Sequence, residues 1–300
     1  MVKCVRPVGR CFTNLTLFWL TYTGKWLHCL EFVDIQILYM VYSHRRRLAD
    51  SKGSCTYMTI QEKLNMDYDG LNENGAITIV ALGDSVTHGA VGWNEINYET
   101  VYWNRLRRKI HALRDYVPVN VINAGIGGTT AMRSLPRMER DVFSHHPDLV
   151  ILCFGLNDVC FSFEEYTQAL AQMFDACNER HIPAIFMTPN MLNTYVTEDT
   201  PEEMRGFAAD TARLQNDGTM DRYMQAACRV AQERGIPVCD CYALWKKRSE
   251  TEDTTRLLAN GINHPLAEMH ELFADALFRQ LFPDAVSVAP AESTLCREAQ

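Results

Sequence analysis

Three loops along the chain carry residue types that support nucleophilic attack on a carbonyl carbon. Ser85, the pair Gly127–Gly128 and Asn157 each follow a short apolar run. A serine hydroxyl is nearly unreactive at its own pKa, so it needs an imidazole that accepts its proton and N–H donors that stabilise an oxyanion. The three loops offer such donors, and the chain holds nine histidines. Each loop taken alone also fits a plainer role, as a helix N-cap, a turn or an Asx cap.

The elements that must bring these loops together are apolar runs that alternate with longer amphipathic stretches from Gly75 onward. This alternation is typical of βαβ units and predicts an α/β fold with a parallel, five-stranded sheet. The expected strands are Ile77–Leu82, Val119–Asn123, Leu149–Phe154, Ala184–Thr188 and Pro237–Cys241. Helices are expected at about 97–114, 129–144, 163–180, 206–234 and 265–281. Ligands bind outside the carboxyl ends of such strands, so the three loops are predicted to converge there.

Four blocks, in this order along the chain, resemble those of the SGNH (GDSL) hydrolase family. Gly83–Gly89 resembles the first block, GDSxTxG, and Asn123–Thr130 resembles the second. Gly155–Asp158 matches the GxND block, and Asn260–Pro265 resembles the last block, which contains the general base. The resemblance covers about residues 76–282. It implies a three-layer, doubly wound, flavodoxin-like fold around the parallel sheet.

The resemblance also implies a serine esterase. Ser85 would attack the ester carbonyl, and His264 would accept its proton and return it to the leaving alcohol, through an acyl-enzyme that water hydrolyses. Ser85, Gly128 and Asn157 would form the oxyanion hole. The sequence has no His/Cys cluster with metal-ligand spacing, no P-loop and no GxGxxG after a strand, so we expect no metal and no cofactor.

One departure from the family pattern concerns the group that orients the base. The family usually carries an acid three positions before the histidine, as DxxH, but position 261 is glycine. Three side chains are candidates to replace it: Asn260, Asn263, and Asp240 near the end of the fifth strand. A backbone carbonyl is a further candidate, because it too can accept the Nδ1 proton, although amide-type oxygens stabilise imidazolium less than a carboxylate does.

Substrate selection is expected from two segments beside the strand ends. Gly92–Tyr102 is rich in aromatic side chains, and Thr188–Arg205 is largely polar. A polar rim favours a short acyl group, such as acetyl on a carbohydrate-like alcohol, over a long-chain lipid. Two alternatives keep the fold: acyl transfer to an alcohol acceptor by the same residues, and ligand binding without turnover, which the missing acid favours.

Charge is spread unevenly along the chain, whose formal net charge is −8. Residues 1–57 hold eight Lys/Arg and three Asp/Glu, which leaves the remainder strongly acidic. A basic stripe that could bind a phosphate backbone is missing from the sequence, so no nucleic-acid partner is expected. The expected partner is a small-molecule ester, and the oligomeric state is left open.

Three regions are predicted along the chain. Residues 1–75 are expected to form an N-terminal extension that is peripheral or poorly ordered, with Met58 as an alternative start. Residues 76–282 form the hydrolase domain, and residues 283–300 form a C-terminal tail. Eleven cysteines without CxxC spacing fit reduced thiols, so a cytoplasmic location without membrane association is predicted. Secretion or membrane anchoring through residues 1–57 is the alternative.

Overall fold

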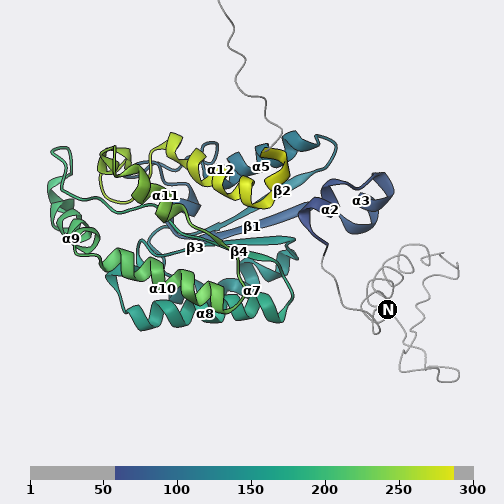
Figure 1. The fold of residues 1–300 in the computed structure, drawn as a ribbon, viewed down its shortest axis with the longest axis horizontal. Coiled ribbons are helices and arrows are strands. Elements are labelled where there is room, and N and C mark those ends of the chain that lie inside the picture. The colour runs from purple at the N-terminus through teal and green to yellow at the C-terminus, as the bar shows by residue number, and fades with distance from the viewer. Residues whose placement is uncertain (1–57, 287–300) are drawn as a thin grey trace, which may run out of the picture. The chain divides into compact units, whose positions relative to one another are not determined.

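A parallel β-sheet forms the centre of the computed structural model, which describes residues 58–286 (Figure 1). Its five strands lie in the order β2-β1-β3-β4-β5, and every pair of neighbours is parallel. The strands are β1 (Ile77–Gly83), β2 (Val119–Gly125), β3 (Leu149–Cys153), β4 (Ala184–Met187) and β5 (Val238–Cys239). The predicted α/β fold with a five-stranded parallel sheet is therefore confirmed.

The register of the central strands brings their carboxyl ends to one level. Gly83 at the end of β1 pairs with Gly125 of β2 on one side and with Cys153 of β3 on the other. The three strands therefore end level with one another. Because the loops singled out in the sequence follow these three strands, all of them start at the same edge of the sheet.

Helices cover both faces of the sheet and complete three layers (Figure 1). One face carries α5 (Tyr102–Leu113), α11 (Cys241–Arg248) and α12 (His270–Leu281), and the other carries α8 (Phe163–Glu179) and α10 (Thr219–Glu233). The shorter and peripheral helices are α2 (Ile60–Leu64), α3 (Tyr68–Asn74), α4 (Ser85–His88), α6 (Ala131–Ser134), α7 (Met138–Asp141), α9 (Arg205–Asn216) and α13 (Pro283–Val286). β3 is buried along its whole length, as expected for a strand covered on both sides.

Helix α8 shows how local sequence specifies these elements. Ser162 caps its N-terminus by accepting the N–H of Glu165 at 3.2 Å. Acidic side chains occupy the first turn, where their negative charge interacts favourably with the helix dipole. Phe174 packs on Phe186 of β4. The buried residues recur at spacings of three and four: Tyr166, Ala169, Leu170, Met173, Phe174 and Cys177. One apolar stripe therefore faces the sheet.

Two of the predicted helices are interrupted. The segment predicted as one helix over 206–234 forms α9 and α10, separated by Gly218 in the left-handed conformation at φ +80°, and the Asp217 Oδ1 accepts the Thr219 N–H at 2.9 Å across this break. The segment predicted over 129–144 forms α6 and α7 with a 3₁₀ turn between them that contains Pro136. Proline has no N–H and cannot continue an α-helix through its interior. Helix α11 was not expected.

The described part of the N-terminal extension packs against the domain. Ile60 and Leu64 of α2 are buried in the hydrophobic core. Between them, Lys63 makes an ion pair with Asp148, just before β3, at 2.8 Å, and both side chains are largely shielded from solvent. Helix α2 is therefore held by apolar burial and by a charged contact with the sheet.

The predicted region boundaries change accordingly. The extension over 1–75, expected to be peripheral or poorly ordered, includes α2, which is packed on the core, and α3, which has no buried residue, while residues 1–57 lie outside the described residues. The predicted tail begins with helix α13, where Ala285 packs on the core, while residues 287–300 also lie outside the described residues. Among the helices of residues 58–286, none has both the length and the apolar character needed to cross a bilayer.

Candidate active site

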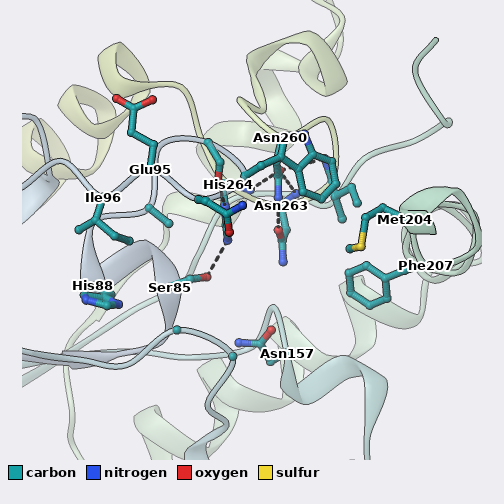
Figure 2. A pocket seen from close by; sticks show the side chains of 17 residues that line it. Ser85, His88, Glu95, Ile96, Asn157, Met204, Phe207, Asn260, Asn263 and His264 are labelled. Atoms are coloured by element: carbon teal, nitrogen blue, oxygen red, sulfur yellow. Dashed lines mark hydrogen bonds between the residues drawn. The ribbon is translucent and has the colours of Figure 1, made fainter. Parts of the chain in front are cut away.

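Ser85 lies in the turn between β1 and the four-residue helix α4. Asp84 caps this helix, because its Oδ1 accepts the Val86 N–H at 3.0 Å. Ser85 is the first helical residue, so its own N–H is among the donors that a helix N-terminus leaves without intrahelical partners. The Ser85 hydroxyl is directed at His264 (Figure 2). One residue therefore combines a candidate nucleophile with a candidate oxyanion donor.

Helix α4 is held in place by β2 and α5. Gly125 at the end of β2 lies very close to α4. A Cβ at this position would come within 2.3 Å of the backbone nitrogen of His88, so only glycine fits. Asn123 donates its Nδ2 to the His88 carbonyl at 3.1 Å. The Trp103 indole donates to the Thr87 carbonyl at 2.8 Å. These contacts fix the short helix and with it the serine turn.

His264 is the histidine that the structure brings to Ser85. Its Nε2 lies 3.0 Å from the Ser85 Oγ, which is within reach for proton transfer. Its Nδ1 lies 2.8 Å from the carbonyl oxygen of Gly92. A carbonyl only accepts hydrogen bonds, so Nδ1 carries the proton and Nε2 is the acceptor for the serine hydroxyl. This tautomer is the one that a general base needs.

Asn260 organises the loop that carries the histidine. Its Oδ1 accepts the backbone N–H groups of Ile262, Asn263 and His264 at 3.1, 2.9 and 2.9 Å. The Ala259 N–H donates to the His264 carbonyl at 2.7 Å. The backbone is therefore fixed on both sides of the imidazole, and the loop itself aims the ring.

The Gly92 carbonyl occupies the position that the sequence assigned to a side chain. Asp240 instead caps α11 and accepts the Thr188 hydroxyl at 2.9 Å. Asn260 binds the loop backbone, and its Nδ2 donates to the Asn263 Oδ1 at 3.0 Å. The predictions that Asp240, Asn260 or Asn263 accepts the imidazole proton are therefore wrong. The backbone carbonyl, which was the further candidate, fits the structure.

Steric constraints explain why position 261 holds a glycine and not the aspartate of the DxxH pattern. Gly261 adopts φ +63°, in the left-handed region, and a Cβ at this position would lie 2.9 Å from the Thr197 Oγ1. An aspartate here would need a strained backbone and a displaced neighbour. Gly92 is presented from the other side by a loop that is closed by an antiparallel bridge between Ala90 and Ile96. The loop after α4 thus supplies the group that the DxxH position cannot.

Asn157 lies on the other side of Ser85 from the histidine, with its amide nitrogen toward Ser85 (Figure 2). Its Nδ2 donates to the Thr129 carbonyl at 2.9 Å, which fixes the amide orientation and leaves the second N–H for a ligand. Gly128 lines the same cleft as Ser85 and Asn157. The structure therefore gathers the three predicted oxyanion donors around one space.

A comparison with protein families decides what this arrangement belongs to. Residues 81–272 match the model of the GDSL-like Lipase/Acylhydrolase family. The chain belongs to this family. It is accordingly a hydrolase that acts on ester bonds, and the resemblance read from the four sequence blocks is confirmed.

Solved structures share the fold of this GDSL-type hydrolase. Axe2, an acetylxylan esterase from Geobacillus stearothermophilus, is 23% identical, with a TM-score of 0.53 over 68% of this chain and 94% of that chain. LAE5, an alpha/beta hydrolase enzyme from the metagenome of Lake Arreo in Spain, is 22% identical, with a TM-score of 0.53 over 69% and 96% of the two chains. At these identities the likeness shows the fold.

A curated relative is similar over a shorter stretch. The uncharacterized lipoprotein YqeF of Bacillus subtilis (strain 168) is 28% identical over 106 residues, which are 35% of this chain. The match spans 42% of the length of that relative, so the chain covers less than half of it. The cytoplasmic location predicted from the cysteines stays a prediction.

The site of this GDSL-type hydrolase is a cleft of about 470 Å³. Both segments expected at its mouth contribute: Trp93, Glu95 and Ile96 come from the first, and Met204 comes from the second. Phe207 of α9 also lines the cleft, and sequence reasoning missed it because it follows the polar segment inside a predicted helix. Within residues 58–286, no group of three or more His, Cys, Asp or Glu side chains is placed to hold a metal ion.

Two other histidines lie near the catalytic candidates. His88 lines the cleft, but its Nε2 faces the Tyr98 hydroxyl at 3.4 Å. His270 of α12 is fully buried, and its Nδ1 accepts the Tyr102 N–H at 3.2 Å. Burial lowers the pKa of His270 to about 3, which keeps this ring neutral. The imidazole that contacts the serine is that of His264.

The pH dependence of activity should report the unusual surroundings of His264. Burial lowers the pKa of this imidazole below 6.5, and the hydrogen bond to the Gly92 carbonyl offsets only part of that effect. Only the neutral ring can accept a proton, so kcat/KM should fall on acidification with a midpoint below 6.5. A pH profile of kcat/KM on a nitrophenyl acetate checks this, and a midpoint above 6.5 would contradict it.

Two buried carboxyl groups lie beneath the serine and asparagine loops. Asp84 Oδ2 and Asp158 Oδ2 are both buried without a hydrogen-bond partner in the described part of the chain. Burial raises the pKa of Asp84 to about 7, although the Val86 N–H opposes this. Burial likewise raises the pKa of Asp158 to about 6, against the hydrogen bond from the Ala131 N–H. Both carboxyl groups therefore stay protonated up to a pH well above the range in which an aspartate usually ionises.

The raised pKa of Asp158 predicts a stability that depends on pH. An unfolded aspartate ionises near 4, so between about pH 4 and pH 6 the folded state holds more protons and loses stability as the pH rises. Asp158→Asn removes this titration and should gain, relative to wild type, on the order of 3 kcal/mol between pH 4 and pH 7. Urea unfolding at the two pH values measures the difference, which a constant offset would contradict.

Proposed function

We propose that this chain hydrolyses carboxylic esters of short acyl groups through an acyl-enzyme on Ser85. The observation that carries the proposal is the 3.0 Å contact between the Ser85 Oγ and the His264 Nε2, with Nδ1 held by a carbonyl. This geometry supports transfer of the hydroxyl proton to the imidazole as Oγ attacks the ester carbonyl. Family membership supports the same chemistry.

Charge that develops on the carbonyl oxygen requires donors on the side away from the imidazole. The Ser85 N–H, the Gly128 N–H and the Asn157 amide are proposed to supply them. His264 then returns its proton to the leaving alcohol, and water attacks the acyl-enzyme by the reverse route, with His264 again as base. In this scheme the Gly92 carbonyl keeps the ring in the productive tautomer and orientation, which is the part an aspartate plays elsewhere.

The lining of the cleft supports a small acyl group on a polar alcohol. Four asparagines line it, Asn94, Asn157, Asn260 and Asn263, together with six apolar side chains, those of Ala90, Trp93, Ile96, Met204, Phe207 and Ile262. A long hydrocarbon chain would cover the Asn263 Nδ2 and the free N–H of Asn157 without giving them hydrogen-bond partners, at a cost of about 1–3 kcal/mol for each group. An acetyl ester of a carbohydrate-like alcohol avoids that cost. Axe2, which shares the fold, carries the name of an acetylxylan esterase.

Covalent labelling tests the proposal most directly. The full chain is treated with a fluorophosphonate, and the modified peptide is located by mass spectrometry. We expect one adduct, on Ser85, together with loss of activity on nitrophenyl acetate. In a series of nitrophenyl esters from acetate to decanoate, kcat/KM should fall with chain length. An unlabelled Ser85 would contradict the nucleophile, and a preference for decanoate would contradict the short acyl group.

A further inference from the structure

The orientation of one amide in the cleft is set by a chain of hydrogen bonds. The Asn260 Oδ1 accepts three backbone N–H groups, so the other end of that side chain must be the Nδ2 donor. This Nδ2 donates to the Asn263 side chain at 3.0 Å, which identifies the accepting atom there as Oδ1. The Nδ2 of Asn263 therefore points the other way, into the cleft (Figure 2).

The Asn263 amide is a donor held ready for a ligand. The residue is only 7% exposed, and its backbone carbonyl accepts the Asn190 Nδ2 at 2.9 Å. No protein group within residues 58–286 accepts a hydrogen bond from the Asn263 Nδ2. The Nδ2 is not one of the buried unpartnered side-chain atoms of residues 58–286, so solvent in the cleft reaches it, and an oxygen of a ligand can replace water as its acceptor.

An apolar wall stands at the far end of the same cleft. Phe207, on the first turn of α9, and Met204, just before that helix, both line the cleft and lie across the open space from Ser85 (Figure 2). Phe207 is 40% exposed although it is a large aromatic residue. The Ser85 hydroxyl, the Asn263 amide and the Phe207 ring thus border one continuous space.

The position of this space relative to His264 decides which part of an ester it takes. Asn263 precedes His264 directly, so both side chains come from one loop. His264 Nε2 must deliver its proton to the leaving oxygen, so the alcohol part has to lie beside this loop. A group that fills the space must offer an acceptor oxygen to the amide and an apolar face to the ring.

We propose that Asn263, Phe207 and Met204 form a subsite for the alcohol part of the ester, and that this alcohol is a saturated polyhydroxylated ring such as a pyranose. Such a ring has a C–H face that packs on the Phe207 ring, and hydroxyl or ether oxygens that accept from the Asn263 Nδ2. The subsite rests on the proposed function, since it places the ring by the proton that His264 returns. Asn263 and Phe207 are substrate-binding residues within it.

A ratio of two substrates tests the subsite. The kcat/KM for a monoacetylated methyl pyranoside is divided by that for ethyl acetate, which has neither a ring nor a second alcohol oxygen. Asn263→Asp keeps the Oδ1 acceptor for Asn260 but replaces the donor with an acceptor oxygen, and should lower the ratio about 10- to 100-fold. Phe207→Ala should lower it about tenfold. Both series are run at pH 8.5. The new carboxylate of Asn263→Asp would raise the pKa of His264, and at this pH the imidazole remains neutral, so its protonation does not change the rates.

Leu244→Ala is the matched control, because this side chain on α11 is also 40% exposed but is absent from the lining of the cleft. Its ratio should equal that of wild type. Unchanged ratios in Phe207→Ala and in folded Asn263→Asp would overturn the subsite. The proposed function would still stand if these variants hydrolyse ethyl acetate. If Asn263→Asp does not fold, Phe207→Ala alone decides. If the wild-type protein hydrolyses none of the esters and Ser85 is not labelled, the proposed function is overturned, and the subsite with it.

Discussion

Ser85→Ala is expected to lower kcat on nitrophenyl acetate by about 10⁴- to 10⁶-fold. The change removes one oxygen atom, which is the atom 3.0 Å from the His264 Nε2. Without it the imidazole has no hydroxyl to activate, and only donors and substrate binding contribute to catalysis. His264→Ala should cost a similar factor, because an unactivated hydroxyl is a poor nucleophile at neutral pH.

The two residues should also act as a unit. The double variant Ser85→Ala/His264→Ala is expected to be no slower than either single variant, since each change alone already removes the acyl-enzyme route. Residue 85 is only 7% exposed and alanine fits its backbone, so thermal unfolding should show a folded protein. Residual activity above a few per cent in Ser85→Ala, with the folded state intact, would show that another group is the nucleophile.

Asn157→Ala is expected to lower kcat by about 10²- to 10³-fold with little change in KM. The amide would stabilise charge that develops in the transition state, and the ground-state carbonyl gains much less from it. Its orientation is fixed by the hydrogen bond to the Thr129 carbonyl at 2.9 Å, so the second N–H is preorganised. Steady-state kinetics on nitrophenyl acetate separates kcat from KM.

Asn178→Ala is the matched control for this variant. Its Nδ2 donates to the Arg234 carbonyl, also at 2.9 Å, but this contact links the ends of α8 and α10 away from the cleft. Each variant loses one amide-to-carbonyl hydrogen bond, which is part-buried at Asn157 and exposed at Asn178. Only Asn157→Ala should lose activity. Equal kcat values for the two variants would remove Asn157 from the oxyanion hole.

Much of the fold was accessible from sequence because buried parallel strands leave a strong local signal. Runs such as Leu149–Phe154 are apolar at every position, since helices cover both faces of the sheet. Helix interruptions were harder to predict. The break between α9 and α10 lies at Gly218, which adopts the left-handed conformation, and the Asp217 side chain accepts the Thr219 N–H beside it; amphipathic periodicity registers neither feature.

The order of the strands was decided by packing, and it explains the error over Asp240. This residue follows β5, which lies at the edge of the sheet, with β4 and β3 between it and β1. Nearness to a strand end therefore did not mean nearness to the serine, which follows β1. Asp240 instead caps its own helix and binds Thr188 after β4.

Ser85, the proposed oxyanion donors and His264 could be predicted from the sequence alone, because each lies in a block whose residue types the chemistry constrains. The partner of the imidazole could be found only in the tertiary structure. A backbone carbonyl carries no residue signature, and Gly92 reaches His264 through a fold that joins positions 172 residues apart. Likewise, only the assembled cleft turns the Asn263 amide and the Phe207 ring toward one space. The sequence determines the type of side chain at each position, whereas packing determines where the groups point and how far apart they lie.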